Sequence, residues 1–181
     1  MGSDKAVADF CGTRMIDRVT GTLRTLADPV VVVARRRSDV GDVSGVVIED
    51  ERPFAGPLPA LVAGLRATGV ERNIVVACDM PFLNTSLLRR LGELLDPDVD
   101  AAVPITQDGV QPLHAAYGDC AIEPLLQAIA SGERSLKGAL DRLRVRWVPE
   151  VEWRPLDPDG RSFLNVNTPE ELRVATELQA I

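Results

Sequence analysis

Short apolar runs without polar alternation divide the chain into segments of similar length. The two clearest runs, Val30–Ala34 and Ile74–Cys78, are rich in β-branched residues. Such runs are typical of strands that are buried on both faces, as in a parallel sheet covered by helices. A weaker run, Arg144–Val148, alternates polar and apolar residues and predicts a half-exposed strand. The strands expected from the pattern are residues 30–34, 46–48, 74–78, 101–105, 113–117, 144–148 and 163–167.

Between these strands, apolar residues recur at helical spacing, and helix-start signals precede several of the repeats. Pro57 fits a first helical turn, Asn84 or Thr85 fits a cap, and Thr168 stands three residues before Glu171, as in a capping box. The helices expected are one capped by Thr13 and ended by Asp28-Pro29, then residues 57–69, 85–95, 121–130, 135–143 and a last one from residue 169. Alternating strands and helices with short connections predict one α/β domain around a mostly parallel sheet.

Composition narrows the class of protein. The chain has 181 residues and a formal net charge of -7, which argues against a nucleic-acid-binding face. No apolar run approaches the roughly 18 residues of a membrane span, and the first residues lack the apolar region of a signal peptide, so we expect a cytoplasmic protein. Cys11, Cys78 and Cys120 form no closely spaced pair, so neither a disulfide framework nor a zinc site is indicated. Cys78 is expected to be a small core residue.

The best candidate for chemistry is Asp79, which follows the strand ending at Cys78 and precedes Met80-Pro81. Proline cannot extend the ladder, so the strand is expected to end near Asp79. In open α/β sheets the carboxyl ends of the strands are where ligands bind. Asp79 can therefore hold a divalent metal against a nucleotide, or it can simply cap the helix that begins after Asn84. The pattern alone does not separate these two roles.

Three further positions leave alternatives open. Asn165 and Asn167 lie two residues apart on an expected strand, so both face one side, where they can orient a phosphate or form a turn and cap before Pro169. His114, the single histidine, is flanked by apolar residues and is more readily a structural residue than a general base. The run Arg35–Arg37 fits a solvated loop better than a phosphate contact.

Six segments of the chain carry a family resemblance: Met1–Ala6, Val47–Asp50, Gly56–Leu58, Cys78–Phe82, Gln111–Ala115 and Asn165–Leu172. They occur in the order seen in the molybdenum cofactor guanylyltransferase family, which the whole chain resembles. The resemblance implies a three-layer nucleotidyltransferase (Rossmann-like) fold with a mixed, mostly parallel sheet. It also implies transfer of GMP from GTP to molybdopterin, with release of pyrophosphate and with Mg²⁺.

Roles for individual residues follow from the resemblance. It implies that Lys5 contacts the GTP phosphates, Asp50 the nucleoside, and Asp79 the magnesium ion, while Asn165 and Asn167 line the molybdopterin side. An acidic chain that binds two anions must concentrate positive charge locally, here on Lys5, the metal and nearby arginines. The resemblance implies that the partners are small-molecule substrates and molybdoenzyme-maturation proteins. It also implies that the chain is a monomer or a weak oligomer.

One part of the family pattern does not occur in the sequence. The family's first strand and its glycine-rich phosphate loop are expected before Met1, and in the family fold that strand lies between the strands at Val30–Ala34 and Ile74–Cys78. We therefore expect an N-terminally truncated domain over residues 1–181, with two apolar strand edges left unpaired. Such a chain is expected to be poorly folded or bound to a partner, and to have little transferase activity. The alternatives are an adenosylcobinamide-phosphate guanylyltransferase, a molybdopterin cytidylyltransferase, or a non-catalytic relic.

Overall fold

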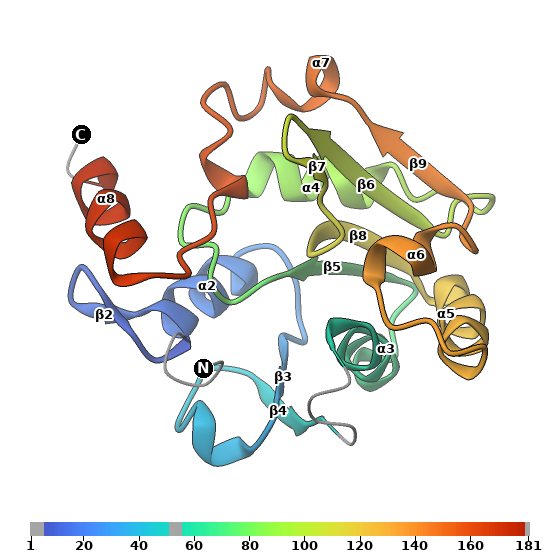
Figure 1. Cartoon of the computed structure of the whole chain (residues 1–181), viewed down its shortest axis with the longest axis horizontal. Helices are drawn as coiled ribbons and strands as arrows, with labels where there is room; N and C mark the ends of the chain where they lie inside the picture. The colour runs from blue at the N-terminus through green and yellow to red at the C-terminus, as the bar shows by residue number, and fades with distance from the viewer. Residues whose placement is uncertain (1–5, 51–55, 180–181) are drawn as a thin grey trace.

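The computed structural model describes residues 6–50 and 56–179, whose helices and strands alternate along the chain (Figure 1). In chain order they are β1 (Asp9–Phe10), β2 (Thr13–Arg14), α2 (Met15–Arg24), β3 (Val31–Ala34), η1 (Arg37–Asp39), β4 (Val46–Glu49), α3 (Pro57–Thr68), β5 (Arg72–Val76), α4 (Thr85–Glu93), β6 (Ala101–Thr106), β7 (Gly109–Val110), β8 (His114–Gly118), η2 (Asp119–Ala121), α5 (Ile122–Ala130), α6 (Leu136–Leu140), β9 (Val145–Val148), α7 (Glu150–Trp153), η3 (Arg161–Phe163) and α8 (Pro169–Gln179).

The main sheet has five strands, in the order β5-β8-β6-β7, with β9 paired to β6. Strands β5, β6 and β9 run in one direction, because β8 is antiparallel to both β5 and β6 while β9 is parallel to β6. The short strand β7 returns from β6 through a turn at Gln107 and Asp108, and Gly109 is the first residue of β7. The sheet is thus mixed, as expected, with β7 and β8 as its reversed strands.

Strands β3 and β4 pair in parallel with each other and form a second sheet of two strands. Within the described ranges no ladder joins β3 to β5. A third, two-residue pairing joins β1 to β2. Whether a further strand belongs between β3 and β5 stays a prediction from the family resemblance.

Side-chain alternation along the main sheet builds a layer of helices on each face, which gives the expected three-layer α/β architecture (Figure 1). On one face Ala101 and Val103 of β6 pack with buried residues of α3, α5 and α6. On the other face Ala102 of β6 packs with the buried leucines of α4 and with Trp153. The apolar positions that predicted the helices are the ones that cover the sheet, since burial of apolar area drives this packing.

The central strand departs from its prediction. β5 ends at Val76, earlier than expected, and its residues from Ile74 to Val76 are half-buried. Cys78 was predicted to lie in the core and is exposed. Cys78 lies beyond the end of β5, in the turn that follows it, and in the described part of the chain β5 pairs with β8 on one side only. An apolar run shows that a strand can be buried on both faces, but the neighbouring elements decide whether it is.

Two other local predictions are corrected. The helix expected from Thr13 begins at Met15, with Arg14 at the cap position and no side-chain capping bond. Residues 163–167 do not form a strand: a 3₁₀ turn ends at Phe163, and the chain then runs in irregular backbone to α8. Asn165 and Asn167 therefore lie in the irregular connection before α8. The backbone N–H of Val166 between them is hydrogen-bonded to a loop and not to a neighbouring strand.

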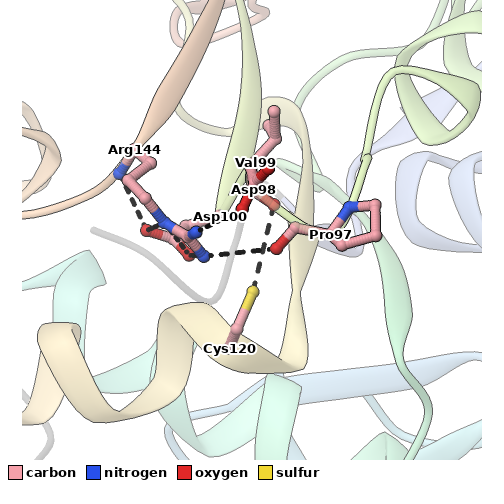
Figure 2. A network of polar contacts seen from close by, with 6 residues as sticks. All are labelled: Pro97, Asp98, Val99, Asp100, Cys120 and Arg144. Carbon is pink, nitrogen blue, oxygen red and sulfur yellow. Dashed lines mark hydrogen bonds and ion pairs between the residues drawn. The ribbon is translucent and has the colours of Figure 1, made fainter.

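A polar network fixes the amino-terminal end of β6 to that of β9 (Figure 2). Asp100 is only 4% exposed. Its Oδ1 accepts from Nη2 of Arg144 at 2.6 Å, and its Oδ2 accepts from the Arg144 backbone N–H at 2.8 Å. The Arg144 hydrogen bond, opposed by partial burial, lowers the pKa of Asp100 below its usual 3.8.

None of the described helices is long and apolar enough to cross a bilayer.

Candidate active site

Asp79 lies in the turn that follows β5. Ladder pairing extends one residue past the strand, because the Ala77 N–H donates to the carbonyl oxygen of Leu113 at 2.9 Å. The chain then turns away from the sheet, and Oδ1 of Asp79 is shielded from solvent. Met80, the next residue, is buried and anchors the turn in the protein. This places a carboxylate at the carboxyl end of the strand, as the sequence predicts.

The alternative role for Asp79, as a helix cap, is wrong. The cap of α4 is Asn84, whose side-chain oxygen accepts a hydrogen bond from the Leu87 N–H at 3.0 Å. Its side-chain amide also donates to the carbonyl oxygen of Leu156 at 2.8 Å, which ties the start of α4 to the chain after α7. Asn84, the residue directly before the helical repeat, therefore supplies the side-chain cap at the start of α4, and Asp79 is not part of that cap.

The Asn165-Val166-Asn167 segment is hydrogen-bonded to the Asp79 turn. The Val166 N–H donates to the carbonyl oxygen of Asp79 at 2.8 Å. Val166 is buried, whereas both asparagines that flank it are exposed. The structure thus brings together two of the predicted site segments, the carboxylate after β5 and the amide pair before α8.

The cap of α8 is made by Thr168 and Glu171, the predicted capping box. The Glu171 N–H donates to Oγ1 of Thr168 at 3.1 Å, and the Thr168 N–H donates to Oε2 of Glu171 at 2.9 Å. The Asn167 N–H also donates to Oε2 of Glu171, at 2.6 Å. Because a threonine and a glutamate supply this cap, the carboxamide groups of Asn165 and Asn167 are not needed for it.

His114 lies at the same end of the sheet, opposite Val76 in the β5–β8 ladder. Its side chain is fully buried, and its ring makes an edge contact with Phe163, with 4.7 Å between ring centroids. Burial lowers the pKa of His114 to about 3, so the ring is neutral near pH 7. A buried, neutral imidazole packed on an aromatic ring supports the structural interpretation over the general base.

The remaining predicted site residues, Asp50 and Lys5, belong to other parts of the chain than the Asp79 turn. Asp50 follows β4 in the two-stranded sheet, and its N–H donates to the carbonyl oxygen of Ala34 at 2.7 Å. Lys5 lies outside the described residues, so its role stays a prediction. Arg35 and Arg36 are exposed in the loop after β3, as expected, and Arg37 is exposed at the start of η1.

A small core cluster supports the Asp79 turn, and no pattern in the sequence indicated it. Phe10, Met15, Val166 and Ala175 are its buried members, and Phe82 packs against them. These residues come from β1, α2, α8 and the two site segments. Such a cluster joins positions that are distant in the sequence, so no periodic signal could have revealed it.

The described residues allow a test of the implied metal. Among residues 6–50 and 56–179, no three His, Cys, Asp or Glu side chains are grouped so that they could hold a metal ion. Magnesium bound with a nucleotide does not require such a group, since it keeps several waters and takes phosphate oxygens beside one or two carboxylates. The shielded Asp79 carboxylate is an oxygen donor of the right kind. The described residues therefore fit a magnesium ion that is held jointly by Asp79 and a nucleotide. They do not form a metal site made of protein side chains alone.

Comparison with known proteins agrees with this fold. Residues 1–148 match the family described as the MobA-like NTP transferase domain. The chain therefore belongs to this family of nucleotidyltransferases. It is 34% identical over 174 residues to a molybdenum cofactor guanylyltransferase from Desulfosudis oleivorans, covering 96% of this chain and 86% of that protein. It is 35% identical over 183 residues to a probable molybdenum cofactor guanylyltransferase from Chloroflexus aggregans, again covering 96% and 86%.

Solved structures give the same assignment. Molybdopterin-guanine dinucleotide biosynthesis protein A from Archaeoglobus fulgidus superposes with a TM-score of 0.80 at 30% identity, covering 97% of this chain and 90% of that one. A 2-C-methyl-D-erythritol 4-phosphate cytidylyltransferase from Thermus thermophilus superposes with a TM-score of 0.73 at 16% identity, covering 99% and 96%. The second likeness shows the shared nucleotidyltransferase fold alone.

Proposed function

We propose that this chain transfers GMP from GTP to the terminal phosphate of molybdopterin, with release of pyrophosphate. The hydrogen bond between Val166 N–H and Asp79 carbonyl carries the proposal, because it joins a carboxylate suited to magnesium to a pair of exposed amides. The relatives named molybdenum cofactor guanylyltransferase support the choice of nucleotide and acceptor. We expect the reaction to take place in the cytoplasm.

The chemistry requires positioning and charge neutralisation more than a covalent nucleophile. An acceptor phosphate oxygen forms a bond to the α-phosphorus as the bond from that phosphorus to the pyrophosphate oxygen breaks. Magnesium, when bound, would neutralise the negative charge shared by the two phosphate groups. Asp79 would hold the ion, and Asn165 and Asn167 would orient the acceptor with their amide groups. Lys5 and Asp50 would contact the GTP phosphates and the nucleoside.

The test is transfer of label from α-³²P-GTP to molybdopterin, with enzyme in excess of GTP so that slow turnover is detected. Parallel reactions use CTP in place of GTP, and adenosylcobinamide phosphate in place of molybdopterin. We expect transfer and pyrophosphate release with GTP and molybdopterin. Transfer only with CTP, or only to cobinamide phosphate, would assign a related nucleotidyltransferase instead. No pyrophosphate release with any pair, even at high magnesium, would contradict the proposal.

A further inference from the structure

Arg18 of α2 is bonded to the turn that carries Asp79. Its Nε donates to the carbonyl oxygen of Pro81 at 2.7 Å, two residues after Asp79. The guanidinium group belongs to a half-buried residue and lies over the Phe10 ring, with Cζ 5.0 Å from the ring centroid. Phe10 is fully buried and makes an edge contact with Phe82, with 5.6 Å between ring centroids. Arg18 thus contacts the turn directly through Pro81 and indirectly through Phe10 and Phe82.

The same guanidinium also reaches the last helix. Its Nη2 donates to Oε1 of Gln179 in α8, the helix that begins just after the Asn165–Asn167 segment. Val166 also donates a hydrogen bond to the Asp79 carbonyl oxygen. The Asp79–Phe82 turn is therefore held by two hydrogen bonds from distant segments, one from Val166 before α8 and one from Arg18 of α2. Figure 1 shows α2, α8 and the loop after β5 gathered in one part of the molecule.

We propose that Arg18 is a positioning residue for Asp79, and this rests on the proposed role of Asp79 as a magnesium ligand. Five donors in a fixed planar fork allow one guanidinium to bond two different elements while it stacks on an aromatic ring. Partners that orient a metal ligand from behind set the affinity of the site, although they do not touch the metal. Arg18 joins the Asp79 turn to α8 by hydrogen bonds to both. It thereby fixes the Asp79 turn relative to the helix that follows Asn165 and Asn167.

The experiment compares Arg18→Gln, Arg18→Lys and Arg24→Gln, with Asp79→Asn as a reference. Arg24 is an exposed residue of the same helix and serves as the matched control. Mn²⁺ binding is measured by electron paramagnetic resonance with and without GTP, and thermal unfolding is measured for each variant. We expect Arg18→Gln to weaken Mn²⁺ binding roughly tenfold. Arg18→Lys keeps the charge but not the fork, so it should weaken binding less, and Arg24→Gln should not weaken it.

A matching kinetic split is expected. Arg18→Gln should raise the magnesium concentration needed for half-maximal transfer more than it lowers the rate at saturating magnesium. If Arg18→Gln lowers the unfolding temperature but leaves Mn²⁺ affinity unchanged, Arg18 is purely structural and the inference is wrong. If Arg18→Gln does not fold, an unchanged Mn²⁺ affinity in folded Arg18→Lys leads to the same conclusion. If Asp79→Asn itself leaves Mn²⁺ affinity unchanged, the metal assignment in the proposed function has failed, and that failure is seen independently of Arg18.

Discussion

The backbone N–H of Val166 donates a hydrogen bond to the carbonyl oxygen of Asp79 across 2.8 Å. This bond joins the turn after β5 to the connection before α8, two segments far apart in the sequence. It places the carboxylate of Asp79 and the exposed amides of Asn165 and Asn167 on neighbouring backbones. The candidate site is therefore a contact between two loops, each fixed by buried neighbours, Met80 in one and Val166 in the other.

Asp79→Asn is expected to reduce GMP transfer by roughly a hundredfold or more, because a neutral amide does not replace a carboxylate on magnesium. The cap of α4 should be unaffected, since Asn84, not residue 79, supplies it. The measurement is single-turnover transfer from labelled GTP beside thermal unfolding. Asp96→Asn, at an exposed position after α4, is the control and should transfer normally. Full transfer by Asp79→Asn would remove this residue from the metal site.

Asn165→Ala and Asn167→Ala are expected to raise the KM for the acceptor while leaving the KM for GTP nearly unchanged. Both side chains are exposed, so each substitution should alter the free energy of unfolding by no more than about 0.5 kcal/mol. Initial rates at varied acceptor and varied GTP separate the two KM values. Gln127→Ala, on the surface of α5, is the matched amide control. An equal rise in both KM values would indicate a general disturbance of the loop and not acceptor recognition.

Thr168→Ala tests the other role of the same connection, because the Thr168 hydroxyl accepts from the Glu171 N–H at 3.1 Å. Loss of this cap should lower the free energy of unfolding by about 1 kcal/mol. Chemical denaturation measures the free energy of unfolding of Thr168→Ala and of the control variant Thr176→Ala. The Thr176 hydroxyl donates to the Leu172 carbonyl oxygen within the helix and takes no part in the cap. If Thr168→Ala is as stable as the parent protein, the capping box does not contribute to α8.

His114→Leu is expected to flatten the acid side of the stability profile. Burial lowers the pKa of His114 from 6.5 to about 3 in the folded protein. Below pH 6.5 the unfolded chain therefore binds a proton that the folded chain does not, and stability falls as pH falls towards 3, by at most about 1.4 kcal/mol per pH unit. His114 is the single histidine, so the difference between the two profiles reports this residue.

The measurement is urea unfolding of both proteins at a series of pH values between about 7 and about 3, the range between the two protonation states of the ring. At neutral pH the leucine variant should be at least as stable as the parent, because the buried ring nitrogens have no hydrogen-bond partner to lose among the described residues. Parallel profiles for the two proteins would show that the ring titrates normally, and so that it is exposed in solution.

Asp100→Asn should lower the free energy of unfolding by about 1–2 kcal/mol, since it weakens charge-assisted bonds while the Arg144 side chain stays about half exposed. The lowered pKa of Asp100 adds stability that is present above pH 3.8 and is lost as pH falls below it. The variant should therefore lose less stability than the parent on acidification through this range. Asp98→Asn is the control, because Asp98 is 99% exposed and lies 3.5 Å from Nη1 of Arg144. Equal effects of the two substitutions would contradict a specific role for Asp100.

Local signals in the sequence predicted the features that depend on neighbours within a few residues. Pro57 at the start of α3, Asn84 at the cap of α4 and the Thr168–Glu171 capping box are all formed as predicted. Their partners lie within one helical turn, so residue type and spacing are enough to determine them. The order of strands and helices, and with it the α/β class, follows from the same short-range patterns.

Burial and contact between distant segments were decided by the tertiary structure. The apolar run at Ile74–Cys78 did not show that Cys78 would be exposed, because the strand ends at Val76 and Cys78 lies in the turn that leaves the sheet. The pattern at Phe163–Asn167 resembles a strand, yet the segment pairs with the Asp79 turn and not with a sheet. The sequence by itself determined the order of the elements, and through the family resemblance it predicted candidate residues for a nucleotidyltransferase site. Only the fold decided that Val166 and Arg18 hold the Asp79 turn in place, because hydrogen bonds between distant segments leave no periodic trace in the sequence.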